Sequence, residues 1–318
     1  MWQKLSFAGG GLGIAAIVLV LTMAPVRAWA ESLLAVFRVQ HFTVLDINPA
    51  TLKSNGLQNN QLLNRTIGSV LSDEITVTQR PQRPQLVANA TTASKIVGFP
   101  VLLLPGETPA SLLLESGAAM NMKLDRDRIQ SILDEAGRSD LQIPASVDGA
   151  TVSVRVPSGV MAFYGNCGST ASRMAGTDAG GEQSGPGNTL SNEKSGDKGD
   201  ATCMSLLQLP SPVVSAPREI DPAQIAQIAL QFLGMSANDA ANFTQTVDWT
   251  STLVLPVVRG ESQYEQVNVN GNEGALLRSA NPKQSDRFSL MWVDNGIVFA
   301  LNGTGDDTTA INLASQLQ

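Results

Sequence analysis

EQVNVNGNEGALLRSANPKQSDRFSLMWVDNGIVFALN, residues 265–302, is the stretch that decides the fold of this chain. Short runs within it alternate between apolar and polar residues, which is the pattern of β-strands that bury one face. The dipeptides Asn270-Gly271 and Asn295-Gly296 interrupt the runs, and Asn-Gly is a strong signal for a two-residue hairpin turn. The stretch therefore predicts antiparallel hairpins. We expect their strands at residues 265–269, 274–278, 288–293 and 297–302.

Similar runs elsewhere predict further strands, and the strands outnumber the helices. The other strands are expected at residues 38–45, 75–78, 118–124, 151–156, 160–164, 204–209 and 252–258. Helical spacing of apolar residues predicts helices at residues 28–37, 91–98, 126–136, 222–234, 237–246 and 307–317. Capping signals support three of these helices, with Asp125, Asp221 and Ser236 as the expected N-caps.

The order of these segments predicts the fold class. Strands that follow one another in meandering runs, with a few separate helices, are typical of α+β proteins. We therefore expect a curved antiparallel sheet with helices packed on one side. One N-terminal transmembrane helix is expected to precede this domain.

The membrane prediction rests on Leu5–Val26, a run of 22 residues without a charge between Lys4 and Arg27. A helix of that length reaches roughly 33 Å, enough to cross the hydrocarbon core of a bilayer. Residues 1–30 are thus predicted to be a membrane anchor or signal segment. Residues 31–318 are predicted to form one extracytoplasmic α+β domain.

A second interpretation of the same segment is a cleaved signal peptide. Ala28-Trp29-Ala30 before Glu31 has the small-x-small form of a signal-peptidase site. The apolar run is longer than a usual signal peptide, which favours the uncleaved single-pass anchor. Cleavage after Ala30 would instead give a secreted or periplasmic protein.

Composition limits the functions that are open to the chain. It has 28 acidic and 21 basic residues, and its formal net charge is −7. A negative surface argues against binding nucleic acid. A single His and two Cys argue against a Cys/His zinc site and against His-based acid–base catalysis. We therefore predict no catalytic residues, no metal and no cofactor.

Cys167 and Cys203 bracket an unusual segment, residues 165–202, which is rich in Gly and Ser and has no Val, Ile, Phe or Trp. Such a composition predicts a flexible insertion without a packed core. In an oxidising compartment the two cysteines are expected to form a disulfide across its base. The alternative is a pair of free, buried thiols.

Four stretches carry a resemblance to a known family. They are WAESLLAVFRVQ (29–40), SKIVGFPVLLLP (94–105), DWTSTLVLP (248–256) and LMWVDNGIVFAL (290–301). In this order they resemble the DUF4367-type extracytoplasmic domain of bacterial transmembrane anti-sigma-factor-like proteins. That domain is similar, more remotely, to the curved-sheet fold of periplasmic lipoprotein carriers and sigma-pathway regulators.

The resemblance implies a membrane-anchored, non-catalytic regulatory or sensory ectodomain of a cell-envelope signalling system. An envelope or sigma-pathway protein would be its partner. Anti-sigma factors carry a cytoplasmic sigma-binding domain, whereas only about five residues precede the membrane segment here. That domain is then encoded separately, or the start is misplaced, or the ectodomain has another use.

Two other functions stay open. One is a periplasmic lipid or lipoprotein carrier, for which the concave sheet would form an apolar cavity. The other is an envelope hydrolase, for which no nucleophile motif is found. For the binding functions, Phe99, Trp249 and Trp292 are the candidate apolar lining of the ligand site, and core packing is the alternative role that we favour for each of them.

Overall fold

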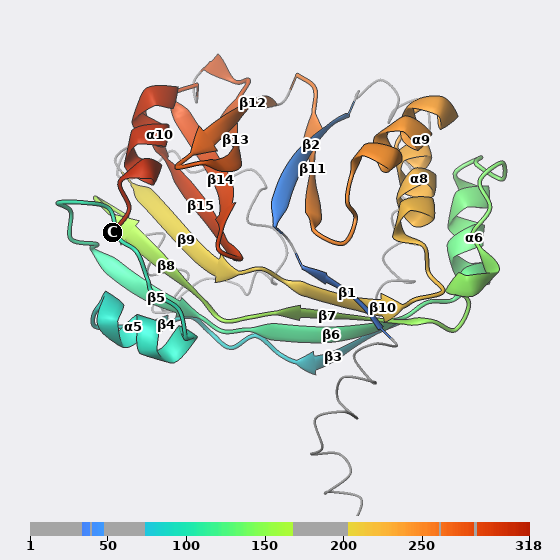
Figure 1. Cartoon of the computed structure of the whole chain (residues 1–318), viewed down its shortest axis with the longest axis horizontal. Helices are drawn as coiled ribbons and strands as arrows, with labels where there is room; N and C mark the ends of the chain where they lie inside the picture. The colour runs from blue at the N-terminus through green and yellow to red at the C-terminus, as the bar shows by residue number, and fades with distance from the viewer. Residues whose placement is uncertain (1–33, 39, 48–73, 168–202, 261, 283–284) are drawn as a thin grey trace, which may run out of the picture.

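The computed structural model describes residues 34–38, 40–47, 74–167, 203–260, 262–282 and 285–318. The chain is an α+β protein with mostly antiparallel sheets, as predicted (Figure 1). The predicted membrane segment 5–26 and nearly all of the insertion 165–202 lie outside the described residues. Within the described ranges no helix is both long and apolar enough to span a bilayer.

The described strands form three hydrogen-bonded sheets instead of the single sheet that we predicted. The largest has eight antiparallel strands, in the order β12 (Ser262–Val269), β13 (Asn272–Ser279), β14 (Arg287–Asp294), β15 (Ile297–Thr304), β9 (Met204–Pro210), β8 (Gly159–Tyr164), β5 (Ser111–Glu115) and β4 (Gln85–Leu86). A second antiparallel sheet has the order β1 (Leu34–Arg38), β10 (Val213–Pro217), β7 (Thr151–Val156), β6 (Ala118–Lys123) and β3 (Ile75–Gln79). The third is a parallel pair, β11 (Thr252–Val258) and β2 (His41–Ile47).

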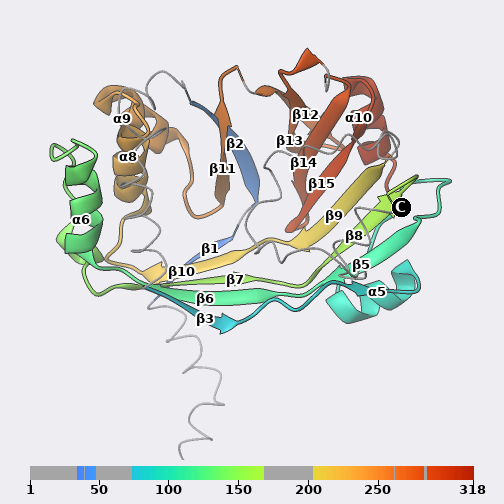
Figure 2. The ribbon, with the colours of Figure 1, turned by 180° about the vertical axis from the view of Figure 1, so that it is seen from behind.

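Five α-helices are described, and they are gathered in two groups. α5 (Ala90–Val97) and α10 (Asp307–Ser315) lie beside the eight-stranded sheet. α6 (Arg126–Glu135), α8 (Pro222–Phe232) and α9 (Ala237–Thr246) lie at the other end, and β2 and β11 stand between this group and β12–β15 in both views (Figure 1, Figure 2). The predicted caps Asp125, Asp221 and Ser236 all accept a hydrogen bond from a backbone N–H of their own helix.

The two Asn-Gly turns form as the sequence predicts. Asn270 and Gly271 have φ angles of 52° and 91°, and Asn295 and Gly296 have φ angles of 49° and 75°. Two consecutive positive φ angles are the signature of a type I′ turn, whose twist matches that of the flanking strands. The turns join β12 to β13 and β14 to β15, with Val269 opposite Asn272 and Asp294 opposite Ile297.

Three pairs of consecutive strands join the eight-stranded sheet to the five-stranded sheet. β5 continues into β6, β7 into β8, and β9 into β10, and each pair is interrupted by only two residues. The interruptions are Ser116-Gly117, Pro157-Ser158 and Ser211-Pro212, and the register places them next to one another. We call these six residues the crease, because the long strands change sheet there.

Glycine is required at two positions here: Gly117 in the crease, and Gly159, the first residue of β8 directly after it. A Cβ on Gly117 would lie 2.8 Å from the carbonyl oxygen of Val156, and a Cβ on Gly159 would lie 2.7 Å from the carbonyl oxygen of Gln208. Real side chains do not approach a backbone atom so closely. The backbones of neighbouring strands therefore meet at the crease without side chains between them.

The large core lies on one face of the eight-stranded sheet, beneath α5 and α10. Trp292 of β14 and Phe299 of β15 are a cross-strand pair in it, stacked with their ring centroids 5.0 Å apart. The fully buried Gln208 forms two hydrogen bonds with the backbone of Leu102, and Tyr164 Oη accepts a hydrogen bond from Leu104 N. These side chains hold the segment 99–105 against the core.

The opposite face of the same sheet carries the parallel β2–β11 pair. Residues next to each other in a strand point to opposite faces, so Met291 and Val293 leave the large core and contact this pair. Phe42 of β2 is 5% exposed and packs on Val293 and Val298. An isolated two-stranded sheet is only marginally stable, and packing against the large sheet gives this pair the buried apolar contacts that stabilise it.

The N-terminal part of the prediction is wrong where the structure describes it. Residues 34–37, predicted as helix, belong to strand β1, which pairs with β10. The predicted strand 38–45 is two strands, because Arg38 ends β1 and His41 begins β2. Val and Phe in β1 favour a strand, and β10, which supplies its hydrogen-bond partners, was not predicted.

The predicted disulfide is present. Cys167 and Cys203 are bonded with their Cα atoms 4.8 Å apart, 36 residues apart in sequence. Cys167 follows β8 and Cys203 precedes β9, and these strands pair antiparallel, so the disulfide closes the base of the insertion as predicted. Cys167 is 2% exposed and packs with Leu113 and Phe163.

Removing the disulfide is expected to destabilise the domain. In the chain-entropy model a bond that closes a loop of this length stabilises a protein by about 3–4 kcal/mol. The double variant Cys167→Ser, Cys203→Ser should lose about that free energy of unfolding in a urea titration. A reductant should weaken the natural chain to the same extent and leave the double variant unchanged. Equal stability of all forms would contradict this prediction.

Glu115, the residue before the crease in β5, is expected to limit stability at neutral pH. Within the described part of the chain its Oε1 atom is buried without a hydrogen-bond partner, and burial raises the pKa of the carboxyl above 4.5. An acid whose pKa rises on folding stabilises the protein at low pH, and that stabilisation is lost as the pH rises through the folded pKa. Glu115→Gln should therefore raise the free energy of unfolding by about 1 kcal/mol at neutral pH.

The same variant should give no gain well below pH 4.5, where the carboxyl is protonated in both states. Glu265→Gln, at an exposed residue of β12, is the matched control. A gain that persists unchanged in acid would show that charge burial is not its cause.

Candidate ligand-binding cavity

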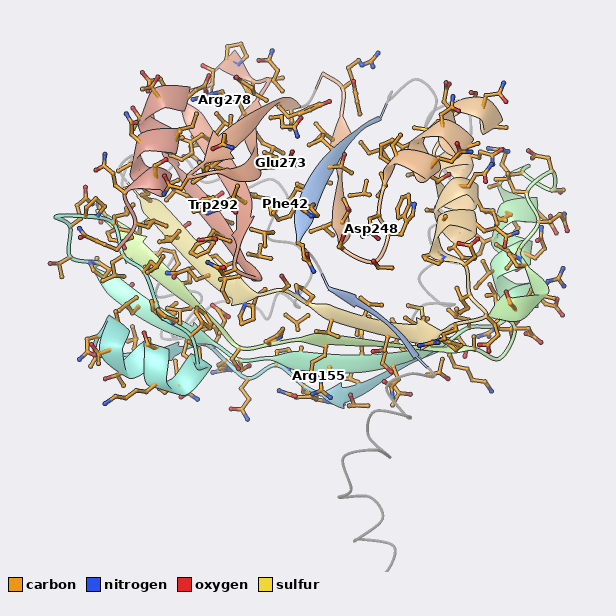
Figure 3. The ribbon with its side chains drawn as sticks, in the orientation of Figure 1. Phe42, Arg155, Asp248, Glu273, Arg278 and Trp292 are labelled. Atoms are coloured by element: carbon orange, nitrogen blue, oxygen red, sulfur yellow. A yellow bond between two sulfur atoms is a disulfide. The ribbon has the colours of Figure 1, made fainter. Side chains whose placement is uncertain are left out.

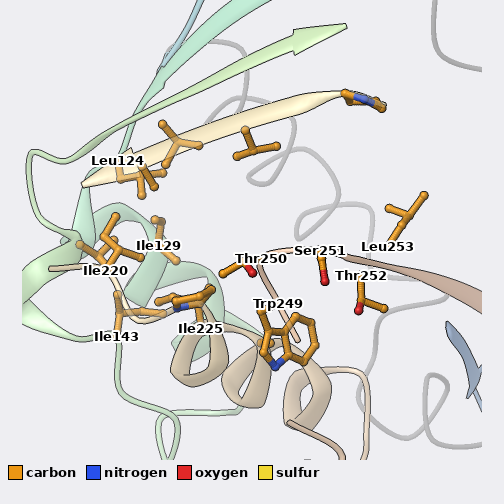
Figure 4. Close-up of a pocket in the computed structure, with 17 residues that line it drawn as sticks. Leu124, Ile129, Ile143, Ile220, Ile225, Trp249, Thr250, Ser251, Thr252 and Leu253 are labelled. Carbon is orange, nitrogen blue, oxygen red and sulfur yellow. The ribbon is translucent and has the colours of Figure 1, made fainter. Parts of the chain in front are cut away.

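An apolar cavity of about 570 Å³ lies between the five-stranded sheet and the α6–α8–α9 group (Figure 4). Small-molecule sites in proteins have volumes of roughly 300–1,000 Å³. Figure 4 shows 17 lining residues, and none of them is charged. Three carry hydroxyl groups, Thr250, Ser251 and Thr252, and they are consecutive in the chain.

The sheet wall of the cavity comes from the long strands that cross the crease. Val152 of β7 and Val214 and Ala216 of β10 line it, and Leu124 follows β6 directly. Even-numbered residues of the same strands, such as Leu206, face the large core on the other side of the crease. One face of each long strand therefore serves the large core at one end and the cavity at the other.

The opposite wall is helical. Ile129 of α6 and Ile225 and Ala226 of α8 face the cavity. α6 and α8 also share a small core that contains Leu133 and Ile143, and several of its members, such as Ile143 and Ile225, line the cavity as well. The helical wall of the cavity and this core are therefore one continuous apolar packing.

The guanidinium of Arg138 joins α6 and α8 near their C-terminal ends. Arg138, just after α6, donates a hydrogen bond to the carbonyl oxygen of Gln231 near the end of α8. The same guanidinium pairs with Asp140 at 2.9 Å, and this bidentate contact raises the pKa of Arg138 and lowers that of Asp140. The helix wall is therefore braced on the side away from the cavity.

The polar part of the lining is the turn at residues 248–252, in which Asp248 accepts hydrogen bonds from the residues that follow it. Its carboxylate accepts hydrogen bonds from Thr250 N (2.9 Å), Thr250 Oγ1 (2.6 Å) and Ser251 Oγ (2.8 Å). These hydrogen bonds, led by the one from the Thr250 hydroxyl, lower the pKa of Asp248 below its ordinary value of 3.8. The carboxylate is thus ionised and held in place at the edge of the cavity.

The same turn is joined to the parallel strand pair. The carbonyl oxygen of Ser251 accepts hydrogen bonds from the backbone N–H groups of Gln40 (2.6 Å) and His41 (3.1 Å), where β2 begins. His41 is the only histidine of the chain. The hydroxyl of Ser251 is donated to Asp248, so it is not paired with the histidine as a hydrolase nucleophile would be.

Of the three predicted lining residues, only Trp249 borders the cavity. Its indole N–H donates to the carbonyl oxygen of Thr244 at 3.0 Å, and its ring meets Phe243 edge-on with centroids 6.3 Å apart. Phe99 and Trp292 lie elsewhere, against the large core. Figure 3 shows Trp292 in the β12–β15 wall and Asp248 near α8 and α9, with Phe42 between them.

The lining residues on α6, α8 and β10 were not singled out from the sequence. Ile129 and Ile225 lie on apolar helix faces that the helical periodicity reveals. The width of such a face is the sequence signal that could have suggested a second apolar contact beside the core. Val214 and Ala216 belong to β10, a strand that was not predicted. In the described ranges, no three His, Cys, Asp or Glu side chains are grouped as metal ligands would be.

Comparison with known proteins adds no family to this description. The chain matches no protein-family model, and no curated protein or solved structure is significantly similar to it. Its function is therefore inferred from the cavity and its surroundings.

The Asp248 turn gives a pH-dependent prediction. A carboxyl whose pKa is lowered on folding stabilises the protein above its unfolded pKa, and the stabilisation is lost as the pH falls through the folded value. Asp248→Asn should therefore lower the urea midpoint at neutral pH, and the difference from the natural chain should vanish in acid well below pH 3.8. Asp286→Asn, an exposed substitution, is the control. A difference that is equal at both pH values would mean that the carboxylate charge does not stabilise the turn.

Proposed function

We propose that residues 31–318 form a non-catalytic, extracytoplasmic binding domain that holds the apolar chain of an amphiphile, such as a lipid, in the cavity between the five-stranded sheet and α8. The observation that carries this proposal is the cavity itself, about 570 Å³ in volume, with no charged residue among the described residues that line it. Burial of an acyl chain in such a space is favourable by about 0.8 kcal/mol per methylene.

Two features support a place outside the cytoplasm. The uncharged run Leu5–Val26 is long enough for a membrane anchor, although it lies outside the described residues. The Cys167–Cys203 disulfide is of a kind that persists in oxidising compartments. The proposal is therefore a protein anchored by residues 5–26, or released after Ala30, with its cavity outside the membrane.

The lipid or lipoprotein carrier is the predicted function that this cavity supports most directly. The regulatory ectodomain suggested by the DUF4367-type resemblance also needs a ligand-sensing surface, and the cavity would serve as one. The envelope hydrolase has less support, because the buried hydroxyl of Ser251 is committed to Asp248.

The proposal predicts that filling the cavity abolishes binding. Ala226 of α8 lines the cavity, whereas Ala229 of the same helix is exposed. Ala226→Phe should place a ring in the cavity and remove most of the labelling by a neutral alkyl diazirine, and Ala229→Phe should label like the natural chain. The measurement is photolabelling of the full chain, held in a nonionic amphipathic polymer, with the labelled peptides identified by mass spectrometry.

Label is expected in peptides that contain α8 and residues 249–253. Thermal unfolding checks that both variants fold. Folded Ala226→Phe protein that still labels these peptides fully would overturn the proposed site. Label confined to the peptides of α5 or β14 would place the ligand at the large core instead.

A further inference from the structure

Among the described lining residues, side-chain hydroxyl groups occur at one place, which gives an amphiphile in the cavity a preferred orientation. Its hydroxyl groups lie together in residues 250–252, and Figure 4 shows them across the cavity from Leu124 and Ile220. A head group without polar partners is costly to bury, and an alkyl chain is not. The head group of a bound amphiphile therefore lies at the 250–252 turn, with its chain toward the aliphatic residues.

This turn offers hydrogen-bond acceptors and few donors. The hydroxyl hydrogens of Thr250 and Ser251 are both donated to Asp248, so their oxygens face a ligand only as acceptors. Within the described part of the chain the hydroxyl of Thr252 forms no hydrogen bond, and it is the remaining group that can either donate or accept. Its main-chain N–H is donated to the carbonyl oxygen of Asp248.

The charge around the cavity has the same sign as the Asp248 carboxylate. Charged residues that adjoin a lining residue in the chain are mostly acidic, and both the cavity walls and the turn contribute them. They are the acidic Asp125, Asp148, Glu219, Asp221 and Asp248 and the basic Lys123 and Arg128. Arg128 is paired with Glu74 at 3.0 Å, which offsets its charge. Arg126 also lies at the wall, where its Nε donates to the carbonyl oxygen of the lining residue Ile143 at 2.9 Å. The like charge that an anionic head group would meet is therefore the Asp248 carboxylate at the turn itself.

From these contacts we propose that the cavity selects single-chain amphiphiles whose head group is neutral or cationic and donates hydrogen bonds, and that it discriminates against carboxylates and phosphates. The head group sits at the Asp248–Thr252 turn, with Asp248 as the residue that sets charge selectivity and the Thr252 hydroxyl as a direct partner. The inference rests on the proposed function of the cavity as a ligand site and names the chemistry of that ligand.

The test compares three competitors that share one alkyl chain: dodecylamine, dodecanol and dodecanoate. Each is titrated against photolabelling of residues 249–253 by the neutral alkyl diazirine, in the full chain and below the competitor's own aggregation concentration. The amine and the alcohol should displace the probe at concentrations about tenfold lower than dodecanoate, because like charges placed together at a binding site are strongly unfavourable. Displacement by dodecanoate at an equal or lower concentration would overturn the proposal.

Two variants assign the selectivity to named groups. Asp248→Asn should remove most of the difference between amine and carboxylate and leave the alcohol little changed. Thr252→Val keeps the shape of the side chain and should weaken the amine and the alcohol several-fold relative to the hydrocarbon probe, which has no head group to lose a partner. Thr92→Val, on the exposed side of α5, is the matched control. Unchanged selectivity in both folded variants would also overturn the proposal.

The proposal and the function on which it rests fail in different ways. If Ala226→Phe does not reduce labelling, the cavity is not the ligand site and the function fails. If Ala226→Phe blocks labelling and dodecanoate competes best, the cavity is a ligand site that prefers anionic amphiphiles, and only the head-group inference fails.

Discussion

The close approach of three neighbouring backbones at the crease is the constraint on which the rest of the structure depends. Gly117 and Gly159 leave no room for a Cβ, so the strands can change direction there without losing their neighbours. Pro157 and Pro212 lack an N–H and are suited to the same interruption. Because β5–β6, β7–β8 and β9–β10 continue across it, the large core and the cavity are built on the same strands, and the position of one determines the position of the other.

The two ends of these strands are packed differently. At one end α5 and α10 close on the sheet, and the large core holds the stacked, buried pair Trp292 and Phe299. At the other end α8 packs with α6 in a small core that also contains Leu124, and Arg138 joins the ends of the two helices. Packing in a protein core normally leaves few voids larger than a water molecule. The cavity between the sheet and α8 is far larger than such voids and is partly open, which is the form of a ligand site.

Much of the local structure could be predicted, because its causes are local. The Asn-Gly turns and the caps Asp125, Asp221 and Ser236 depend on residues a few positions apart, and all of them form as expected. The parallel pairing of β2 with β11 joins segments about two hundred residues apart in sequence, and no local pattern reports it. For the same reason the sequence could not show which of the candidate aromatic residues line the cavity. Trp249 and Trp292 look alike in the sequence, and only the tertiary fold places one at the cavity and the other in the large core.

The turn at Asp248 connects the cavity to the rest of the domain. Thr250 and Ser251 line the cavity with their side chains, while the carbonyl oxygen of Ser251 holds the first N–H groups of β2. β2 in turn packs through Phe42 on Val293 and Val298 of the eight-stranded sheet. A head group bound at this turn would thus act on the one element that bridges the two helix groups. A carrier requires only that the cavity bind and release its ligand, whereas a sensor also requires such a connection. The hydrogen bonds from Ser251 to β2 involve the same residues that give the cavity its polarity, so the proposed carrier and regulatory functions would use one site.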